Sequence, residues 1–291
     1  MVGLRPPPAL ARGPAVQAGQ RPGGERGAST GQYEEMSIAS VARPVALVTG
    51  TGRRQGIATA IARRLAETGW DVAFTHLDSY DARMPWGADE GAVRELAGFL
   101  DGNGARACPI EADFEDVTAP ARVFDQAVRD LGPVGALILG HCESVATGIM
   151  DTDVESFDRH FAVNTRAGWL LIREYARRFS ETPGSGRIIA LTSDHTAGNM
   201  PYGASKGALD RIVIAAATEL AGRGITANCV NPGPTDNGWI NEQLKTELTV
   251  GSPLGRLGRP RDAANLVAFL CSPDGGWING QLLHSDGGLT G

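Results

Sequence analysis

The sequence lacks the features typical of membrane-spanning, secreted or nucleic-acid-binding chains. No apolar run approaches the roughly 18 residues that a membrane-spanning helix needs. The four cysteines among the 291 residues are far apart and form no metal-ligand pair, which favours reduced thiols in a reducing compartment. The net charge of −6 argues against nonspecific binding to nucleic acid or an anionic membrane. We therefore expect a cytoplasmic protein with no metal site, no membrane anchor and no nucleic-acid partner.

The composition divides the chain into two parts. Residues 1–40 are rich in Pro, Gly, Ala and Arg and bury too little apolar surface to offset their ordering entropy, so we predict a disordered extension. An Arg-rich, acid-poor start is also compatible with a transit peptide, although an extension ahead of a start at Met36 is the preferred interpretation. Residues 41–291, long enough for a sizeable core, are predicted to form one domain.

Short apolar runs alternate with helical stretches from residue 44 onward. The expected strands are PVALVTG, DVAFTH, ARACPIEAD, VGALILG, GRIIALTS, GITANCVNPG and GQLLHSDGG. Continuously apolar strands separated by helices are typical of a parallel sheet covered on both faces. The predicted fold class is therefore α/β, a single doubly wound Rossmann domain with about seven parallel strands.

A glycine-rich turn, TGTGRRQGIA, follows the first strand and leads directly into a helix that begins near Ile57. Gly50, Gly52 and Gly56 lie where a tight turn brings the backbone close to a pyrophosphate at a helix N-terminus. The alternative is a glycine-rich turn without a ligand. Its place after the first strand of such a fold favours dinucleotide binding.

The residues near this turn favour NADP(H) over NAD(H). Arg53 and Arg54 can reach a 2′-phosphate on the adenosine ribose, unless they are simply solvated surface arginines. His76 ends the second strand, where an acidic residue would hold the ribose hydroxyls of NAD and repel that phosphate. Asp78, two residues later, keeps NAD(H) as the alternative.

Several longer stretches together resemble the short-chain dehydrogenase/reductase family over roughly residues 43–289. They are VALVTG, FAVNTRAGWLL, GRIIALTS, YGASKGAL, GITANCVNPGPT and the C-terminal SPLGRLGRPRDAANLVAFLCSPDGGWINGQLLHSDGG. The last is closest to the 3-oxoacyl-acyl-carrier-protein reductase branch. The resemblance implies a nicotinamide cofactor, assembly into a homo-oligomer (dimer or tetramer), and a catalytic tetrad of Asn164, Ser193, Tyr202 and Lys206.

The chemistry of carbonyl reduction explains these residue types. Hydride transfer to a carbonyl leaves an alkoxide, which needs a proton from a positioned acid such as Tyr202. Lys206 lies one helical turn further, about 6 Å along the axis, and is expected to lower the pKa of the phenol and to bind the ribose hydroxyls. The resemblance implies that Ser193 donates to the substrate oxygen and that Asn164 holds a water leading to Lys206.

The resemblance also implies further cofactor contacts. Asp113, just after the third strand, matches an acidic residue that contacts the adenine amine, although it is equally compatible with a strand-end cap. Pro232 and Gly233 follow the sixth strand where the family cradles the nicotinamide. Asn237 occupies the position of a carboxamide-binding threonine, with Thr235 as the substitute donor.

Three departures from the family pattern concern the same site. Gly50 and Gly56 are six apart and Ala58 replaces the last glycine of the turn. The family's Asn-Asn-Ala-Gly after the fourth strand is replaced by residues 139–142, Leu-Gly-His-Cys. Ser193 and Tyr202 are nine residues apart, fewer than usual. His141 and His195 are candidate extra proton donors, but a purely structural role is favoured for both.

We predict an NADP(H)-dependent, ketoreductase-like oxidoreductase acting on a carbonyl or secondary alcohol. Its small-molecule substrate, with acyl thioesters and polyketides among the candidates, is expected under a lid at residues 238–251. The departures motivate one alternative, a protein that keeps the fold as a cofactor-binding scaffold or sensor, or as a non-redox enzyme.

Overall fold

A computed structural model describes residues 43–240 and 242–290. Residues Ala42–Gly291 form one compact unit. The predicted disorder of residues 1–40 lies outside the described residues and stays a prediction.

A seven-stranded sheet forms the centre of this unit, with the strands in the order β3-β2-β1-β4-β5-β6-β7 and every neighbouring pair parallel. β1 lies in the middle, where Val48 pairs with Phe74 on one side and Ile138 on the other. The strands are β1 (Val45–Val48), β2 (Asp71–His76), β3 (Ala107–Glu111), β4 (Val134–Leu139), β5 (Gly186–Leu191), β6 (Ile225–Asn231) and β7 (Leu282–His284). The strand order reverses between β1 and β4, which is the point where doubly wound sheets bind ligands.

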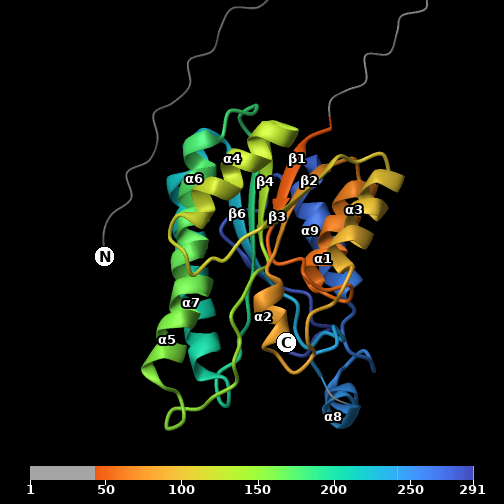
Figure 1. Ribbon diagram of the computed structural model, residues 1–291, viewed down its shortest axis with the longest axis vertical. Helices are drawn as coiled ribbons and strands as arrows, with labels where there is room; N and C mark the ends of the chain where they lie inside the picture. Colours follow the sequence, from red (N-terminus) through yellow and green to blue (C-terminus); the bar gives the residue numbers. More distant parts are fainter. Residues whose placement is uncertain (1–42, 241, 291) are drawn as a thin grey trace, which may run out of the picture. The chain divides into compact units, whose positions relative to one another are not determined.

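Helices cover both faces of the sheet (Figure 1). α4, α6 and α7 pack on one face around Phe124, Leu171 and Leu209, whereas α1, α3 and α9 pack on the other around Leu65 and Leu96. The helices are α1 (Ile57–Glu67), α2 (Asp78–Ala82), α3 (Ala92–Gly102), α4 (Ala119–Leu131), α5 (Val154–His160), η1 (Phe161–Arg166), α6 (Ala167–Arg178), α7 (Met200–Glu219), η2 (Ala221–Arg223), α8 (Glu242–Gly251), α9 (Pro260–Cys271) and η3 (Pro273–Gly275).

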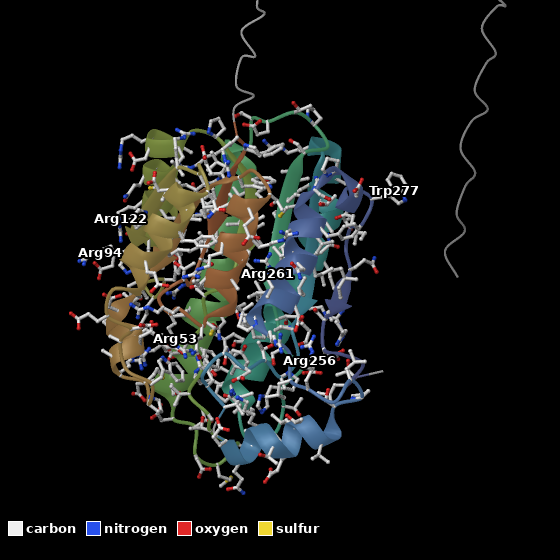
Figure 2. The ribbon with its side chains drawn as sticks, turned by 90° about the vertical axis from the view of Figure 1, so that its right-hand side faces the viewer. Arg53, Arg94, Arg122, Arg256, Arg261 and Trp277 are labelled. Atoms are coloured by element: carbon white, nitrogen blue, oxygen red, sulfur yellow. The ribbon has the colours of Figure 1, made fainter. Side chains whose placement is uncertain are left out.

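Contacts between neighbouring helices also involve their outer surfaces. Figure 2 shows the arginine-bearing side, on which Arg261 of α9 pairs with Glu67 of α1 at 2.6 Å. This pair joins two helices that pack against each other. It is a surface ion pair, so its stabilisation is about 0–1 kcal/mol.

The predicted α/β doubly wound sheet is confirmed, and the differences lie in the connections. The pattern predicts one long helix near residues 154–179, whereas the structure has α5 and α6 joined by the π-helical turn η1. The helix α4 was not predicted. The connection from β2 to α3 is long and contains the short helix α2, which the apolar pattern also did not indicate. Among residues 43–240 and 242–290, no helix has the length and apolarity to cross a membrane.

Candidate active site

A cavity of about 430 Å³ opens at the carboxyl ends of the central strands. It extends from the turn after β1 to the N-terminal part of α7, so one continuous space connects the predicted cofactor turn with the predicted catalytic tyrosine. The predicted site residues that line it are Gly50, Gly52, Arg53, Gly56, Ile57, His76, Asp113, Tyr202, Lys206 and Pro232. The lining described for this cavity does not include the predicted residues Arg54, Asn164, Ser193, Gly233 and Thr235.

The turn after β1 needs glycine at position 50 because it packs closely against the segment after β4. Gly50 has φ of +84°, and a Cβ added there would lie 2.6 Å from the Cα of His141. Such a contact is closer than real Cβ atoms make, so the close approach of β1 and β4 requires glycine. Gly56 then precedes α1, whose first residue Ile57 lines the cavity. A turn followed at once by a helix N-terminus suits a pyrophosphate.

Two buried polar atoms at this cavity also fit a polar ligand. The hydroxyls of Tyr80 and Thr192 are buried and have no hydrogen-bond partner among the described residues. Both residues line the cavity. Because an unpaired buried hydroxyl is costly, a bound molecule with polar groups would satisfy them. The residues present therefore fit a dinucleotide.

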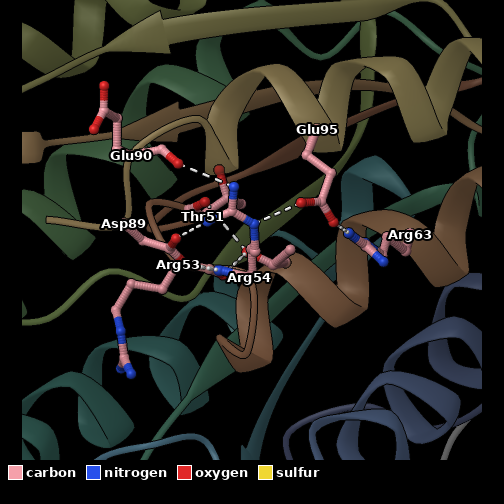
Figure 3. Close-up of polar contacts among 8 residues, drawn as sticks. Thr51, Arg53, Arg54, Arg63, Asp89, Glu90 and Glu95 are labelled. Atoms are coloured by element: carbon pink, nitrogen blue, oxygen red, sulfur yellow. Dashed lines mark hydrogen bonds and ion pairs between the residues drawn. The ribbon is translucent and has the colours of Figure 1, made fainter. Parts of the chain in front are cut away.

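Arg54 does not reach the cavity, contrary to its expected role at a 2′-phosphate. Its guanidinium donates to Asp89 and, at 2.5 Å, to Glu95, and Arg63 donates to Glu95 as well (Figure 3). The backbone N–H of Arg54 also donates to Asp89, at 2.8 Å. Asp89 lies in the β2–α3 connection and Glu95 lies in α3. Arg54 therefore links both segments to the glycine-rich turn.

The other residues predicted for the adenosine end do line the cavity. His76 ends β2, and its Nδ1 lies 3.2 Å from the carboxylate of Asp78. Asp113 follows β3, and its Oδ1 accepts from the backbone N–H of Glu115 at 2.9 Å, as a turn-capping residue does. Asp113 therefore both caps the turn after β3 and lines the cavity.

Arg83 and Glu143 form an ion pair that the sequence reasoning missed. Arg83, from the β2–α3 connection, donates to both carboxylate oxygens of Glu143, one of them at 3.0 Å. Glu143 follows β4 and its side chain is only 2% exposed. Both residues line the cavity, so the pair joins two of its walls. The charged and aromatic residues at positions 78–90 were the feature of the sequence that could have indicated this contact.

His141 is a structural residue that replaces part of the family's motif after β4. Its Nε2 lies 3.1 Å from the carbonyl oxygen of Val163, which can only accept, so Nε2 carries the proton. Its Nδ1 then accepts from the hydroxyl of Thr49 at 2.7 Å. Burial lowers the pKa of His141 to about 3, and the charge of Lys206 acts in the same direction. A neutral imidazole held at both nitrogens joins β1 to η1, as the favoured structural reading predicted.

Tyr202 and Lys206 lie together on α7 and face the cavity. The Nζ of Lys206 is 5.8 Å from the centroid of the Tyr202 ring and donates to the carbonyl of Leu191 at 3.0 Å. Burial raises the pKa of Tyr202 well above its ordinary value, while a hydrogen bond with Ser193 acts in the opposite direction. Burial lowers the pKa of Lys206, because it disfavours the charged form of the lysine just as it disfavours the charged form of the tyrosine. The expectation that the lysine lowers the tyrosine pKa was therefore wrong, because burial sets the direction of the shift and Lys206 is not among the groups that shift it.

The short connection from β5 to α7 brings the backbone close to the catalytic helix. A Cβ added to Gly203 would lie 1.8 Å from the carbonyl oxygen of His195, so only glycine fits beside Tyr202. The backbone N–H of His195 donates to the Oγ of Ser193 at 3.2 Å. His195 itself is exposed. The shortened loop therefore keeps Ser193 next to Tyr202, although Ser193 is not among the cavity-lining residues described above.

The side chain of Asn164 is used to hold the backbone after β4. Its Oδ1 accepts from the N–H of Glu143 at 2.8 Å, and its Nδ2 donates to the carbonyl of Glu143 at 2.9 Å. The same Nδ2 donates to the Oγ of Ser205, which in turn donates to the carbonyl of Tyr202. A chain of hydrogen bonds thus joins the loop after β4 to the first turns of α7.

The segment after β6 supplies the remaining wall. Pro232 and Asn237 line the cavity, together with Trp239. Thr235 is buried, and its hydroxyl donates to the carbonyl of Gly233 at 3.1 Å. Asn237, at the family's carboxamide-binding position, therefore lines the cavity, whereas Thr235, the expected substitute donor, does not.

Comparison with known proteins identifies the family. A family model described as enoyl-(acyl carrier protein) reductase matches residues 50–290. The oxidoreductase YjdA of Bacillus subtilis (strain 168) is 37% identical over 84% of this chain and 96% of its own length. The chain belongs to the short-chain dehydrogenase/reductase family.

Two further relatives of this short-chain dehydrogenase/reductase carry a cofactor in their names. An NADPH-dependent aldehyde reductase-like chloroplastic protein of Arabidopsis thaliana is 37% identical over 84% of this chain and 94% of its own length. The solved structure of a blue fluorescent protein from a metagenomic library, in complex with NADPH, superimposes with a TM-score of 0.76. It is 34% identical and covers 85% of this chain and 98% of that one. The family assignment makes this chain an oxidoreductase of Rossmann type.

Proposed function

We propose that this short-chain dehydrogenase/reductase transfers hydride between NADP(H) and a small carbonyl compound or secondary alcohol. The observation that carries the proposal is the single cavity lined by both the glycine-rich turn and Tyr202. Gly50, Gly56 and Ile57 would hold the pyrophosphate, Asp113 the adenine, and Pro232 with Asn237 the nicotinamide. When bound, the nicotinamide supplies or accepts the hydride.

NADP(H) is proposed over NAD(H) because the cavity wall near β2 carries basic side chains. Arg53 and His76 both line it, whereas Arg83, which is also basic, is already paired with Glu143. A 2′-phosphate is best recognised by such groups. The named cofactor of two relatives supports the same choice.

Tyr202 is proposed as the proton donor to the substrate oxygen in the reducing direction. Because burial raises the pKa of Tyr202, its hydroxyl is protonated at neutral pH and ready to donate. Ser193, hydrogen-bonded to Tyr202, would orient that hydroxyl toward the substrate. Lys206, fixed by the carbonyl oxygens of Leu191 and His141, would place its positive charge under the ring and toward the ribose.

The substitution Tyr202→Phe tests this assignment. A panel of aldehydes, quinones and aliphatic and aromatic ketones is reduced with NADPH, and turnover by the variant is expected to fall roughly 10²–10⁴-fold. The dissociation constant for NADPH, measured by calorimetry, should stay within about threefold, since no cofactor contact is removed. Undiminished turnover in the variant would contradict the role of Tyr202.

A second candidate function is cofactor binding without redox chemistry. The observation that favours it is the position of Ser193 outside the cavity lining described above. Tight NADPH binding by the wild-type protein, with no turnover across the carbonyl panel, would support this second function over the first.

We also propose that the protein assembles as a homo-oligomer through α5 and α6. Phe157 and Trp169 on these helices are exposed, and Phe157 stacks on Phe161 with ring centroids 4.7 Å apart. Exposed apolar clusters of this kind often mark interfaces. Sedimentation velocity of the full chain and of Trp169→Lys tests the proposal, because the variant should shift toward the monomer.

A further inference from the structure

Three side chains from three separate segments meet at one wall of the cavity. Arg53 comes from the glycine-rich turn, Trp86 from the β2–α3 connection and Trp239 from the segment after β6. The two indoles stack with centroids 4.9 Å apart and planes within 8° of parallel. The guanidinium carbon of Arg53 lies 4.7 Å from the Trp86 centroid and 5.9 Å from that of Trp239. We call these three residues the clasp.

Two members of the clasp, Trp86 and Arg53, are fixed by a further polar contact of the side chain. The indole N–H of Trp86 donates to the Oδ1 of Asp81 at 2.9 Å, and Asp81 is buried. Arg53 donates to the backbone carbonyl of Asn237 at 2.8 Å. This bond runs from the glycine-rich turn directly to the segment that bears Trp239, two residues later. The contacts therefore link segments that are far apart in the sequence.

The position of the clasp relates it to the cofactor. Arg53, Asp81, Asn237 and Trp239 all line the same cavity as Gly50. The clasp therefore joins the wall that would hold the pyrophosphate to the wall that would hold the nicotinamide. A cofactor that leaves the cavity between these two walls must separate them, and separating them breaks the contacts of the clasp.

We infer that the clasp is a positioning element that holds the segment after β6 over the bound dinucleotide and limits the rate at which the cofactor dissociates. The inference rests on the proposed function, because it requires a cofactor in this cavity. An aromatic pair and a partly buried cation–π contact together are strong enough to slow separation about tenfold or more. Loss of either indole should therefore raise the NADPH dissociation rate by about tenfold.

Stopped-flow displacement of NADPH by excess NADP⁺ measures that rate directly, through the cofactor's own fluorescence. The variants are Trp86→Ala, Trp239→Ala and the double variant. The matched control is Trp277→Ala, since Trp277 is 98% exposed and projects from the far end of the sheet (Figure 2). Each single variant should dissociate about tenfold faster, and the control should stay within twofold of wild type.

The double variant separates the clasp from two unrelated effects. Because the two indoles contact each other, the double variant should be little faster than either single variant. Rates in both single variants within twofold of wild type, or a double variant that multiplies the single effects, would overturn the inference. Trp86→Phe, which keeps a stacking ring, should lie between wild type and Trp86→Ala, and it replaces Trp86→Ala if that variant does not fold.

One outcome concerns the proposed function instead. If calorimetry shows that the wild-type protein binds neither NADPH nor NADH, the proposed function fails and the clasp has no cofactor to retain. If wild-type binding is tight but the variant rates are unchanged, the clasp inference fails alone. The measurement uses the full chain and requires no knowledge of the substrate.

Discussion

The buried imidazole of His141 should make the protein sensitive to acid by an amount that follows from its pKa. Burial lowers the pKa of His141 from the ordinary 6.5 to about 3, so the folded protein binds fewer protons than the unfolded chain between these values. Stability from the neutral imidazole is therefore complete above pH 6.5 and is lost as the pH falls toward 3. At pH 4.5, two pH units below 6.5, the loss is about 3 kcal/mol.

Urea unfolding of the wild-type protein and of His141→Asn, at pH 7.5 and at pH 4.5, measures this loss. The variant loses hydrogen bonds to Thr49 and Val163 and should be less stable at pH 7.5. Acid should then remove about 3 kcal/mol more from the wild type than from the variant. Other titrating groups are common to both proteins and cancel. A difference between the two proteins that stays constant from pH 7.5 to 4.5 would refute the reasoning.

Three further predictions concern the site. Gly203→Ala should destabilise the protein by about 1–3 kcal/mol, because the added Cβ clashes with the loop after β5. Gly207→Ala is the comparison: an added Cβ there meets nothing within 4 Å, so this variant should stabilise α7 by up to about 1 kcal/mol. Thermal unfolding of the two variants and the wild type measures both effects. His76→Asp should lower NADPH affinity relative to NADH by at least about tenfold, while Arg54→Ala should leave that ratio within about threefold, as calorimetry would show. Because burial raises the pKa of Tyr202, carbonyl reduction should be independent of pH near neutrality and alcohol oxidation should accelerate as the pH rises; a reduction rate that falls from pH 6 to 8 would contradict this.

The centre of the sheet could be predicted from the sequence because β1 and β4 are short, nearly continuous apolar runs. The burial of Val45–Val48 and Val134–Leu139 along their whole lengths is what such runs indicate. The connections could not be predicted in the same way. Nothing in the periodicity around Asn164 distinguishes the π-helical turn η1 from the α-helices on either side of it.

The candidate site was predicted where family motifs fix it and missed where this chain departs from them. Tyr202 and Lys206 keep their spacing and line the cavity together. Arg83 and Trp86 lie in a connection whose residues show no helical or strand periodicity. Their contacts with Glu143 and Arg53 could therefore be identified only from the structure. The spacing of Tyr202 and Lys206 in the sequence also does not show how deeply the tyrosine is buried, which is why the direction of its pKa shift was predicted wrongly.

Asn164 has a consequence for how genetic evidence from this protein is interpreted. Its carboxamide satisfies both backbone groups of Glu143, a residue whose carboxylate is bonded across the cavity by Arg83. Truncation to alanine would therefore release a whole wall of the cavity. Loss of activity in Asn164→Ala would therefore report the loss of this cavity wall. It would not by itself assign Asn164 a role in proton transfer.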